Sequence, residues 1–200
     1  MHPLDRMNMS EQELVNQEVH NAYEAIKAGG IILYPTDTVW GIGCDATNTE
    51  AIKKIYALKQ REETKSMIVL VNGDRMMWSV FKDVPETAWQ ILDLSEKPTT
   101  LVLDNPKNVA DNIIAPDNTL GVRIVKEPFC YKLMERMKRP LVSTSANISG
   151  MPTPTQFKEI DHHILDGVDY VVNLHREKVA AKPSAIIKLG NDMTVKVIRP

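Results

Sequence analysis

The stretch that decides the fold is SEQELVNQEVHNAYEAIKAGGIILYP, at residues 10–35. Ser10, followed three residues later by Glu13, forms the capping-box pattern that starts a helix. The amphipathic run behind it predicts a helix that ends at the glycine pair 29–30, because glycine readily takes the left-handed conformation of a helix stop. The apolar run 31–34 then predicts a short buried strand. A helix followed directly by a buried strand indicates an α/β protein.

The same alternation continues along the chain. The segment 35–45, PTDTVWGIGCD, is expected to be a loop. Short strands cluster toward the C-terminus, which argues against a purely parallel sheet. We therefore predict one α/β domain over 1–200, with a twisted mixed sheet, flanking helices and a loosely ordered N-terminus at 1–9. The remaining expected helices are 49–59, 85–94, 129–137 and 156–165, and the remaining expected strands are 67–71, 99–103, 121–125, 141–142, 170–172, 185–189 and 194–198.

Composition narrows the class of protein. A chain of 200 residues can bury a core without disulfides or metals, and Cys44 and Cys130 fit no ligand spacing and indicate a reducing compartment. No apolar run is long enough to span a bilayer, and the N-terminus lacks the features of a signal or transit peptide. A net charge of −2 disfavours a broad nucleic-acid-binding surface. We expect a cytoplasmic protein with no membrane contact.

The first group of candidate functional residues is cationic. Lys59, Arg61 and Lys65 lie between an expected helix and an expected strand. They could simply complement the negative end of the helix dipole. They could also converge into an anion pocket, in which Arg61 offers a two-pronged contact to phosphate or carboxylate. The spacing alone favours neither interpretation.

The second group is the hydroxyl-rich segment PLVSTSANISG at 140–150. An apolar strand that leads into several serines, a threonine and an asparagine places hydrogen-bonding groups at a strand end, where α/β proteins bind ligands. Alternatively, these side chains bond their own backbone in turns. The chain has no nucleophile elbow, Walker sequence or dinucleotide fingerprint. Adjacent His162 and His163 make a poor metal pair, so no metal-ligating side chain is predicted.

Taken together, several segments resemble the YrdC-type threonylcarbamoyl-AMP synthases, in their short single-domain form. The resemblance is carried in order by YPTDTVWGIG at 34–43, KQREETKSM at 59–67, LGVRIV at 120–125, STSANISGMPTP at 143–154, KPSAIIKL at 182–189 and VIRP at 197–200. It implies a twisted α/β sheet with a concave cationic cavity. It also implies that L-threonine, bicarbonate or CO2, and ATP react to threonylcarbamoyl-AMP and pyrophosphate. A downstream tRNA threonylcarbamoyl transferase complex would use the product, and weak tRNA or double-stranded RNA binding is possible for such a chain.

The resemblance also implies a role for individual residues. Mg2+ would accompany ATP as substrate. The catalytic set would be Lys59, Arg61, Ser145 and Asn147; the ATP-binding set Arg61, Lys65, Thr119, Ser145, Thr153 and Arg199; and the threonine-binding set Thr38, Arg123, Ser143 and Ser184.

Three positions depart from the family pattern, namely Glu62, Leu70 and Ala185. They concern the detail of substrate geometry, since none removes a member of the catalytic set. The main alternative is a non-catalytic YrdC-like module that binds a nucleotide or RNA. A second alternative is a carbamoyl-adenylating module like that of hydrogenase-maturation carbamoyltransferases, which normally comes with a zinc-finger segment that two isolated cysteines could not form. The chain stops at Pro200, so the expected short form would have a pocket that is more open or that is closed by an element other than a C-terminal domain.

Overall fold

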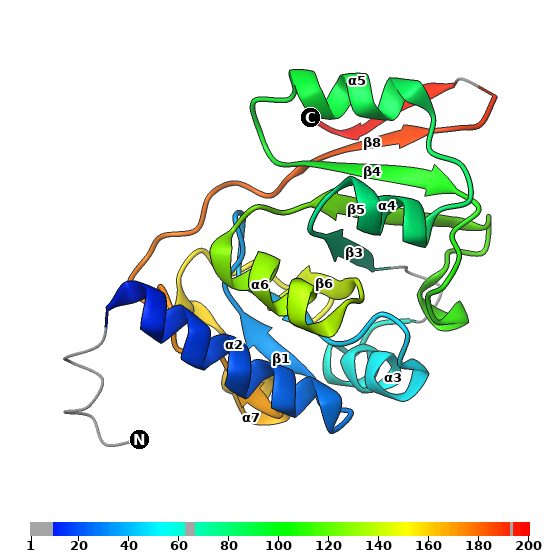
Figure 1. Ribbon diagram of the computed structural model, residues 1–200. Helices are drawn as coiled ribbons and strands as arrows, with labels where there is room; N and C mark the ends of the chain where they lie inside the picture. The colour runs from blue at the N-terminus through cyan, green and yellow to red at the C-terminus, as the bar shows by residue number, and fades with distance from the viewer. Residues whose placement is uncertain (1–9, 63–66, 193) are drawn as a thin grey trace.

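The computed structural model describes residues 10–62, 67–192 and 194–200. Within these residues, nine strands form one mixed sheet in the order β7-β1-β2-β6-β3-β5-β4-β8-β9, flanked by helices (Figure 1). The strands are β1 Ile32–Tyr34, β2 Gly41–Gly43, β3 Ile68–Val71, β4 Thr99–Asp104, β5 Thr119–Ile124, β6 Leu141–Ser145, β7 Tyr170–Val171, β8 Ala185–Leu189 and β9 Val195–Arg199. The helices are α2 Glu11–Lys27, α3 Thr49–Leu58, α4 Asp74–Val80, α5 Glu86–Leu94, α6 Pro128–Met137 and α7 His162–Gly167, with short 3-10 turns at Asp111–Ile113 and Phe157–Glu159.

The sheet is mixed, as predicted. Strand pairs β1/β7, β3/β5 and β4/β8 are parallel, and the other neighbouring pairs are antiparallel. The α/β class is therefore confirmed. β6 lies between β2 and β3, with Ser145 opposite Gly41 and Ser143 opposite Ile68. This insertion of a late strand between two early ones brings distant parts of the chain together.

The N-terminal helix forms as the local pattern predicts. The Ser10 side chain accepts from the backbone N–H of Glu13, and the Glu13 carboxylate accepts from the backbone N–H of Ser10. Gly29 follows the helix with a φ of 81°, which is the left-handed stop. The apolar face of α2 packs beside α6 on one face of the sheet (Figure 1). A second, larger core fills the opposite face.

The predicted loop at 35–45 is wrong in part, because Gly41–Gly43 is a buried strand. A Cβ at Gly43 would lie 2.1 Å from the carbonyl oxygen of Val142, and a Cβ at Gly41 would lie 3.3 Å from the Tyr34 ring. These glycines thus let the fully buried Tyr34 ring cross the strand, where its hydroxyl donates to Val142 O at 3.0 Å. The packing of Tyr34 thus accounts for both glycines.

Two other sequence predictions need correction. The helix expected over 156–165 is instead a 3-10 turn followed by the short helix α7, and α4 had no predicted counterpart. The strand expected over 141–142 extends to Ser145, so the hydroxyl-rich residues 143–145 belong to the sheet rather than to a turn. Among the described residues, no helix has the length and apolar character needed to cross a bilayer.

Candidate active site

A cavity of about 260 Å³ lies where the ends of several strands meet. Three arginines and no acidic residue occur among the described residues that line it, so the cavity is cationic. Its wall combines segments that are far apart in the sequence, because the sheet order places them side by side. The lining residues are Thr36, Thr38, Val39, Trp40, Gly41, Arg61, Met67, Ile68, Thr100, Arg123, Ser143, Thr144, Ser145, Thr153, Pro183, Ser184, Ile186 and Arg199.

All four residues of the expected threonine-binding set lie in this wall. Thr38, Arg123, Ser143 and Ser184 are each at most 6% exposed. Buried polar side chains are costly unless they are hydrogen-bonded or serve a ligand. Their gathering in one cavity is the arrangement that a small polar ligand requires.

The loop between β1 and β2 holds Thr38 in place through its own hydrogen bonds. The Thr36 hydroxyl donates to Val39 O at 2.7 Å and accepts from the backbone N–H of Thr38 at 3.0 Å. Because its single hydrogen is used on Val39, the 3.0 Å contact between the Thr36 and Thr38 hydroxyls has Thr38 as donor. The loop is thus shaped before any ligand binds.

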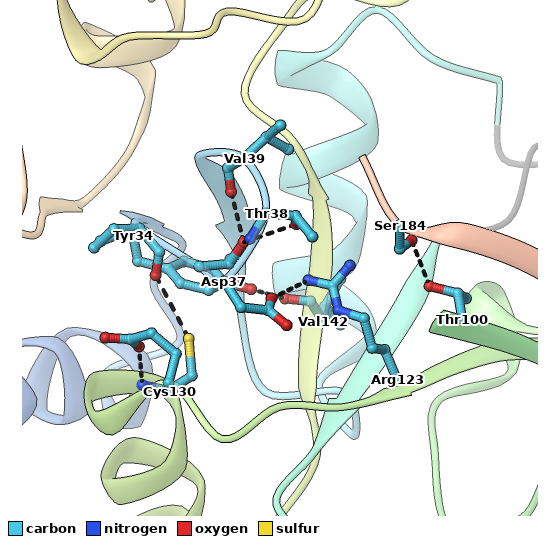
Figure 2. A network of polar contacts seen from close by, with 12 residues as sticks. Tyr34, Asp37, Thr38, Val39, Thr100, Arg123, Cys130, Val142 and Ser184 are labelled. Carbon is cyan, nitrogen blue, oxygen red and sulfur yellow. Dashed lines mark hydrogen bonds and ion pairs between the residues drawn. The ribbon is translucent and has the colours of Figure 1, made fainter. Parts of the chain in front are cut away.

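Arg123 extends from β5 into the cavity wall and is ion-paired from the loop. Its Nη2 lies 3.0 Å from Oδ1 of Asp37, and Figure 2 shows the two side chains pointing toward each other. The Nε atom of Arg123 is buried and has no hydrogen-bond partner among the described residues. Because Arg123 also lines the cavity, its guanidinium can face a carboxylate there.

On the opposite side of the cavity, Ser184 is fixed by two contacts. Its hydroxyl lies 2.8 Å from the hydroxyl of Thr100, which is also buried (Figure 2). Its carbonyl oxygen accepts from Nε of Arg199 at 2.9 Å. Burial, and then the nearby charge of Arg123, lowers the pKa of Arg199. The penultimate residue is therefore part of the wall, although strand β9 is exposed along its length.

Lys59 does not lie in the cavity wall, where a member of an anion pocket would be expected. It is 1% exposed and does not line the cavity; its Nζ donates to the carbonyl oxygens of Ser145 and Asn147. Its own carbonyl accepts from the backbone N–H of Ser149 at 2.9 Å. Burial, and then the charge of Arg61, lowers the pKa of Lys59 from 10.5 to about 8. The lysine thus holds the segment 145–149 against the end of α3.

The structure distributes the other expected site residues as follows. Arg61, Ser145 and Thr153 line the cavity, together with Arg199. Asn147 does not, and its Nδ2 donates to Met151 O at 2.7 Å. Thr119 is buried at the start of β5 but does not line the cavity, and its hydroxyl donates to Asp117 at 2.7 Å. Lys65 lies outside the described residues.

The three departures from the family pattern also have positions. Leu70 lies opposite Arg123 in the β3/β5 register but packs into the core beneath α2 and α6. Ala185 starts β8 opposite Thr99, and Glu62 is exposed. None of the three lines the cavity.

Asp37 and Thr100, which contact Arg123 and Ser184, are among the residues of this site that the sequence interpretation missed. Asp37 lies between the two threonines of the loop, and Thr100 sits two residues after Pro98 in an apolar strand. No spacing pattern could connect Asp37 to Arg123, which is 86 residues away. Only the strand order reveals both contacts.

A larger cavity of about 540 Å³ lies elsewhere, between the end of α2 and the start of α3. It contains none of the expected site residues, and an exposed Arg139–Asp45 ion pair of 2.8 Å occupies part of its wall. Over the described residues, no group of three His, Cys, Asp or Glu side chains could hold a metal ion. The smaller, cationic cavity is the one lined by expected site residues.

Comparison with known families identifies the class. The family model for the Sua5, YciO and YrdC proteins, described as telomere recombination, matches residues 24–200. The chain belongs to this family, which confirms the resemblance found in the sequence.

Individual relatives make the likeness more specific. The chain is 30% identical to a threonylcarbamoyl-AMP synthase of Acinetobacter baumannii over 194 residues, covering 94% of this chain and 100% of the relative. It is 31% identical to a threonylcarbamoyl-AMP synthase of Pseudomonas fluorescens over 186 residues, covering 91% and 96%.

Two solved structures have the same fold. E. coli YciO superposes with a TM-score of 0.79 at 25% identity, covering 96% of this chain and 90% of YciO. P. abyssi Sua5 complexed with L-threonine gives a TM-score of 0.77 at 26% identity, covering 91% of this chain. The chain spans about half of that protein, 53% of its length.

Proposed function

We propose that this chain is a threonylcarbamoyl-AMP synthase, which makes threonylcarbamoyl-AMP and pyrophosphate from L-threonine, bicarbonate or CO2, and ATP. The observation that carries the proposal is a cationic cavity in which five buried polar residues meet Arg61 and Arg199. The relatives named as threonylcarbamoyl-AMP synthases support the same reaction.

The chemistry fits a site without a nucleophilic side chain. The amine of threonine attacks CO2, forms a C–N bond and loses a proton, which gives a carbamate. A carbamate oxygen then attacks the α-phosphorus of ATP, and the bond to the β-phosphate oxygen breaks to release pyrophosphate. Each step joins substrates to each other, so the protein contributes orientation and charge stabilisation. A cavity wall of arginines and hydroxyls supplies both.

The arginines of the cavity have different tasks in this proposal. Arg123 would hold the threonine carboxylate, because a guanidinium binds a carboxylate through paired hydrogen bonds. Arg61 and Arg199 would face the phosphates, where negative charge builds up in the transition state. Mg2+ would arrive on the triphosphate of ATP, since the chemistry of phosphoryl transfer normally needs it.

Lys59 and Asn147 would act from behind this wall. Lys59 holds the carbonyls of the segment that carries Ser145, and Asn147 ties the same segment to Met151 O. We assign both residues to the catalytic machinery because they set the position of Ser145. The expected ATP contact of Thr119 would require its hydroxyl to leave Asp117.

The product has to be consumed, because a mixed carbamic–phosphoric anhydride hydrolyses readily. We propose that a downstream tRNA threonylcarbamoyl transferase complex takes it up in the cytoplasm, with at most weak tRNA or double-stranded RNA binding by this chain. The net charge of −2 supports weak rather than strong RNA affinity.

The test is pyrophosphate release from ATP with threonine and bicarbonate supplied together or singly, with the adenylate identified by mass spectrometry. We expect release only when both are present. Serine should react about 10–200-fold less efficiently, because it lacks one methyl contact. ATP binding without turnover would instead support a non-catalytic nucleotide-binding module. Equal turnover of serine and threonine would contradict the threonine assignment.

A further inference from the structure

The ion pair between Asp37 and Arg123 is the feature of the site that the proposed reaction does not use. Its Oδ1–Nη2 distance is 3.0 Å, and the side chains are 25% and 5% exposed. An arginine this deeply buried needs a counter-charge, because an unpaired buried charge is strongly destabilising. Among the described residues, Asp37 is the group that provides it.

Asp37 lies behind the guanidinium rather than in the active-site wall. It lines a second cavity of about 340 Å³, which shares Thr36, Thr38, Val39 and Trp40 with the first. The β1–β2 loop therefore separates the two cavities, with Arg123 on one side and Asp37 on the other. A substrate in the first cavity would meet the guanidinium without displacing the carboxylate.

A second arginine near Arg123 adds to the need for a counter-charge. Arg199 lines the same cavity and lies near enough for the charge of Arg123 to act on its ionisation. The two guanidiniums repel each other, and both would attract any phosphate in the cavity. The contact with Asp37 holds the guanidinium of Arg123 against the β1–β2 loop.

The loop is built to keep Asp37 in this position. Thr36 and Thr38, its two neighbours, are joined through the Thr36 hydroxyl, which also binds Val39 O at 2.7 Å. The backbone on both sides of Asp37 is thereby fixed. A carboxylate on a fixed backbone can define the direction of a long arginine side chain.

We propose that Asp37 is a positioning residue that reserves Arg123 for the carboxylate of the amino-acid substrate and so sets the affinity for threonine. The proposal rests on the proposed function. It assigns to Asp37 no contact with the reacting atoms. Its effect is on the amino-acid side of the reaction, because Arg61 and Arg199 remain to bind ATP.

The test compares Asp37→Ala and Asp37→Asn with the parent in steady-state pyrophosphate release, varying threonine and ATP separately. We expect Asp37→Ala to raise KM for threonine about tenfold while KM for ATP changes by less than about twofold. Asp37→Asn keeps an oxygen that can accept from Nη2, so it should recover part of the loss. A purely structural role would lower the melting temperature and change both KM values alike.

Asp45→Ala is the matched control. Asp45 follows in the same segment and also pairs with an arginine, Arg139, at 2.8 Å, but outside the active-site cavity. Asp45→Ala should leave both KM values unchanged.

If Asp37→Ala does not fold, Asp37→Asn tests the proposal by itself, and we expect it to raise the KM for threonine. An active parent with unchanged threonine KM in the folded variants would overturn this inference only. A parent without threonine-dependent turnover would overturn the proposed function and this inference with it.

Discussion

Replacing Lys59 by methionine should separate stability from activity. Methionine keeps most of the side-chain volume but removes the ammonium group that donates to the carbonyls of Ser145 and Asn147. The substitution therefore removes both side-chain bonds to the segment of Ser145 and leaves the backbone bond from Ser149 N–H to the Lys59 carbonyl. It opens no large cavity at a position that is only 1% exposed.

The expected stability change is small because two effects oppose each other. Hydrogen bonds from a charged donor contribute about 1.5–3 kcal/mol each, and both are lost. Burial lowers the pKa of Lys59 from 10.5 to about 8, and a shift of this size means that holding the charged form costs about 3 kcal/mol. At pH 7 the lysine is protonated in the folded and the unfolded chain, so methionine relieves that full cost. The net loss is about 0–3 kcal/mol, or at most about 10 °C in Tm.

The expected activity change is large. A misplacement of catalytic groups by about 1 Å costs about a hundredfold in rate, and the segment that carries Ser145 loses the two bonds that hold the carbonyls of Ser145 and Asn147. Pyrophosphate release and thermal melting on the same preparations measure both quantities. Lys54→Met is the control, since Lys54 is an exposed lysine of α3 that donates to Gly29 O at 3.0 Å. A folded Lys59→Met variant with parental activity would refute the reasoning.

Three further predictions follow from the same site. In protein labelled at the lysine ε-carbon, one NMR resonance should titrate near pH 8 and be absent from Lys59→Met. The buried charge of Lys59 lowers the free energy of unfolding by its full amount below pH 8, and this destabilisation disappears as the pH rises toward 10.5. Arg61→Ala should reduce adenylate formation by at least about tenfold with an unchanged fold, because a charge-assisted phosphate contact is lost; a folded variant with the parental rate would argue against the anion pocket. Deleting Arg199 and Pro200 should weaken ATP binding about tenfold by calorimetry with Tm close to that of the parent, whereas unchanged affinity would mean that Arg199 does not contact ATP.

Much of the local structure could be predicted because short-range patterns encode it. The Ser10 capping box, the glycine stop at Gly29 and the apolar runs of the strands depend on neighbours within a few residues. The order of the family motifs also indicated which side chains belong to the candidate site. Thr38, Arg123, Ser143 and Ser184 indeed line one cavity, and their role in threonine binding stays a prediction.

The failures of sequence interpretation all involve contacts between distant segments. β2 has glycines at both ends and therefore no strand signal, and it forms because Tyr34 packs across it and β6 pairs with it. The hydroxyl-rich residues 143–145 extend β6 because β2 and β3 supply hydrogen-bonding partners on both sides. Backbone pairing across the sheet outweighed the local preference of serine and threonine for turns.

The sequence by itself thus determined the helix caps, most strands, the α/β class and the family, because these depend on local periodicity and on motifs in order. The tertiary structure alone decided the direction in which each charged side chain points. It turned Lys59 onto two backbone carbonyls, left Thr119 outside the cavity and joined Asp37 to Arg123. A buried charge is costly unless a partner pairs with it or accepts its hydrogen bonds. The order of the strands in the sheet determines which groups lie near enough to do so.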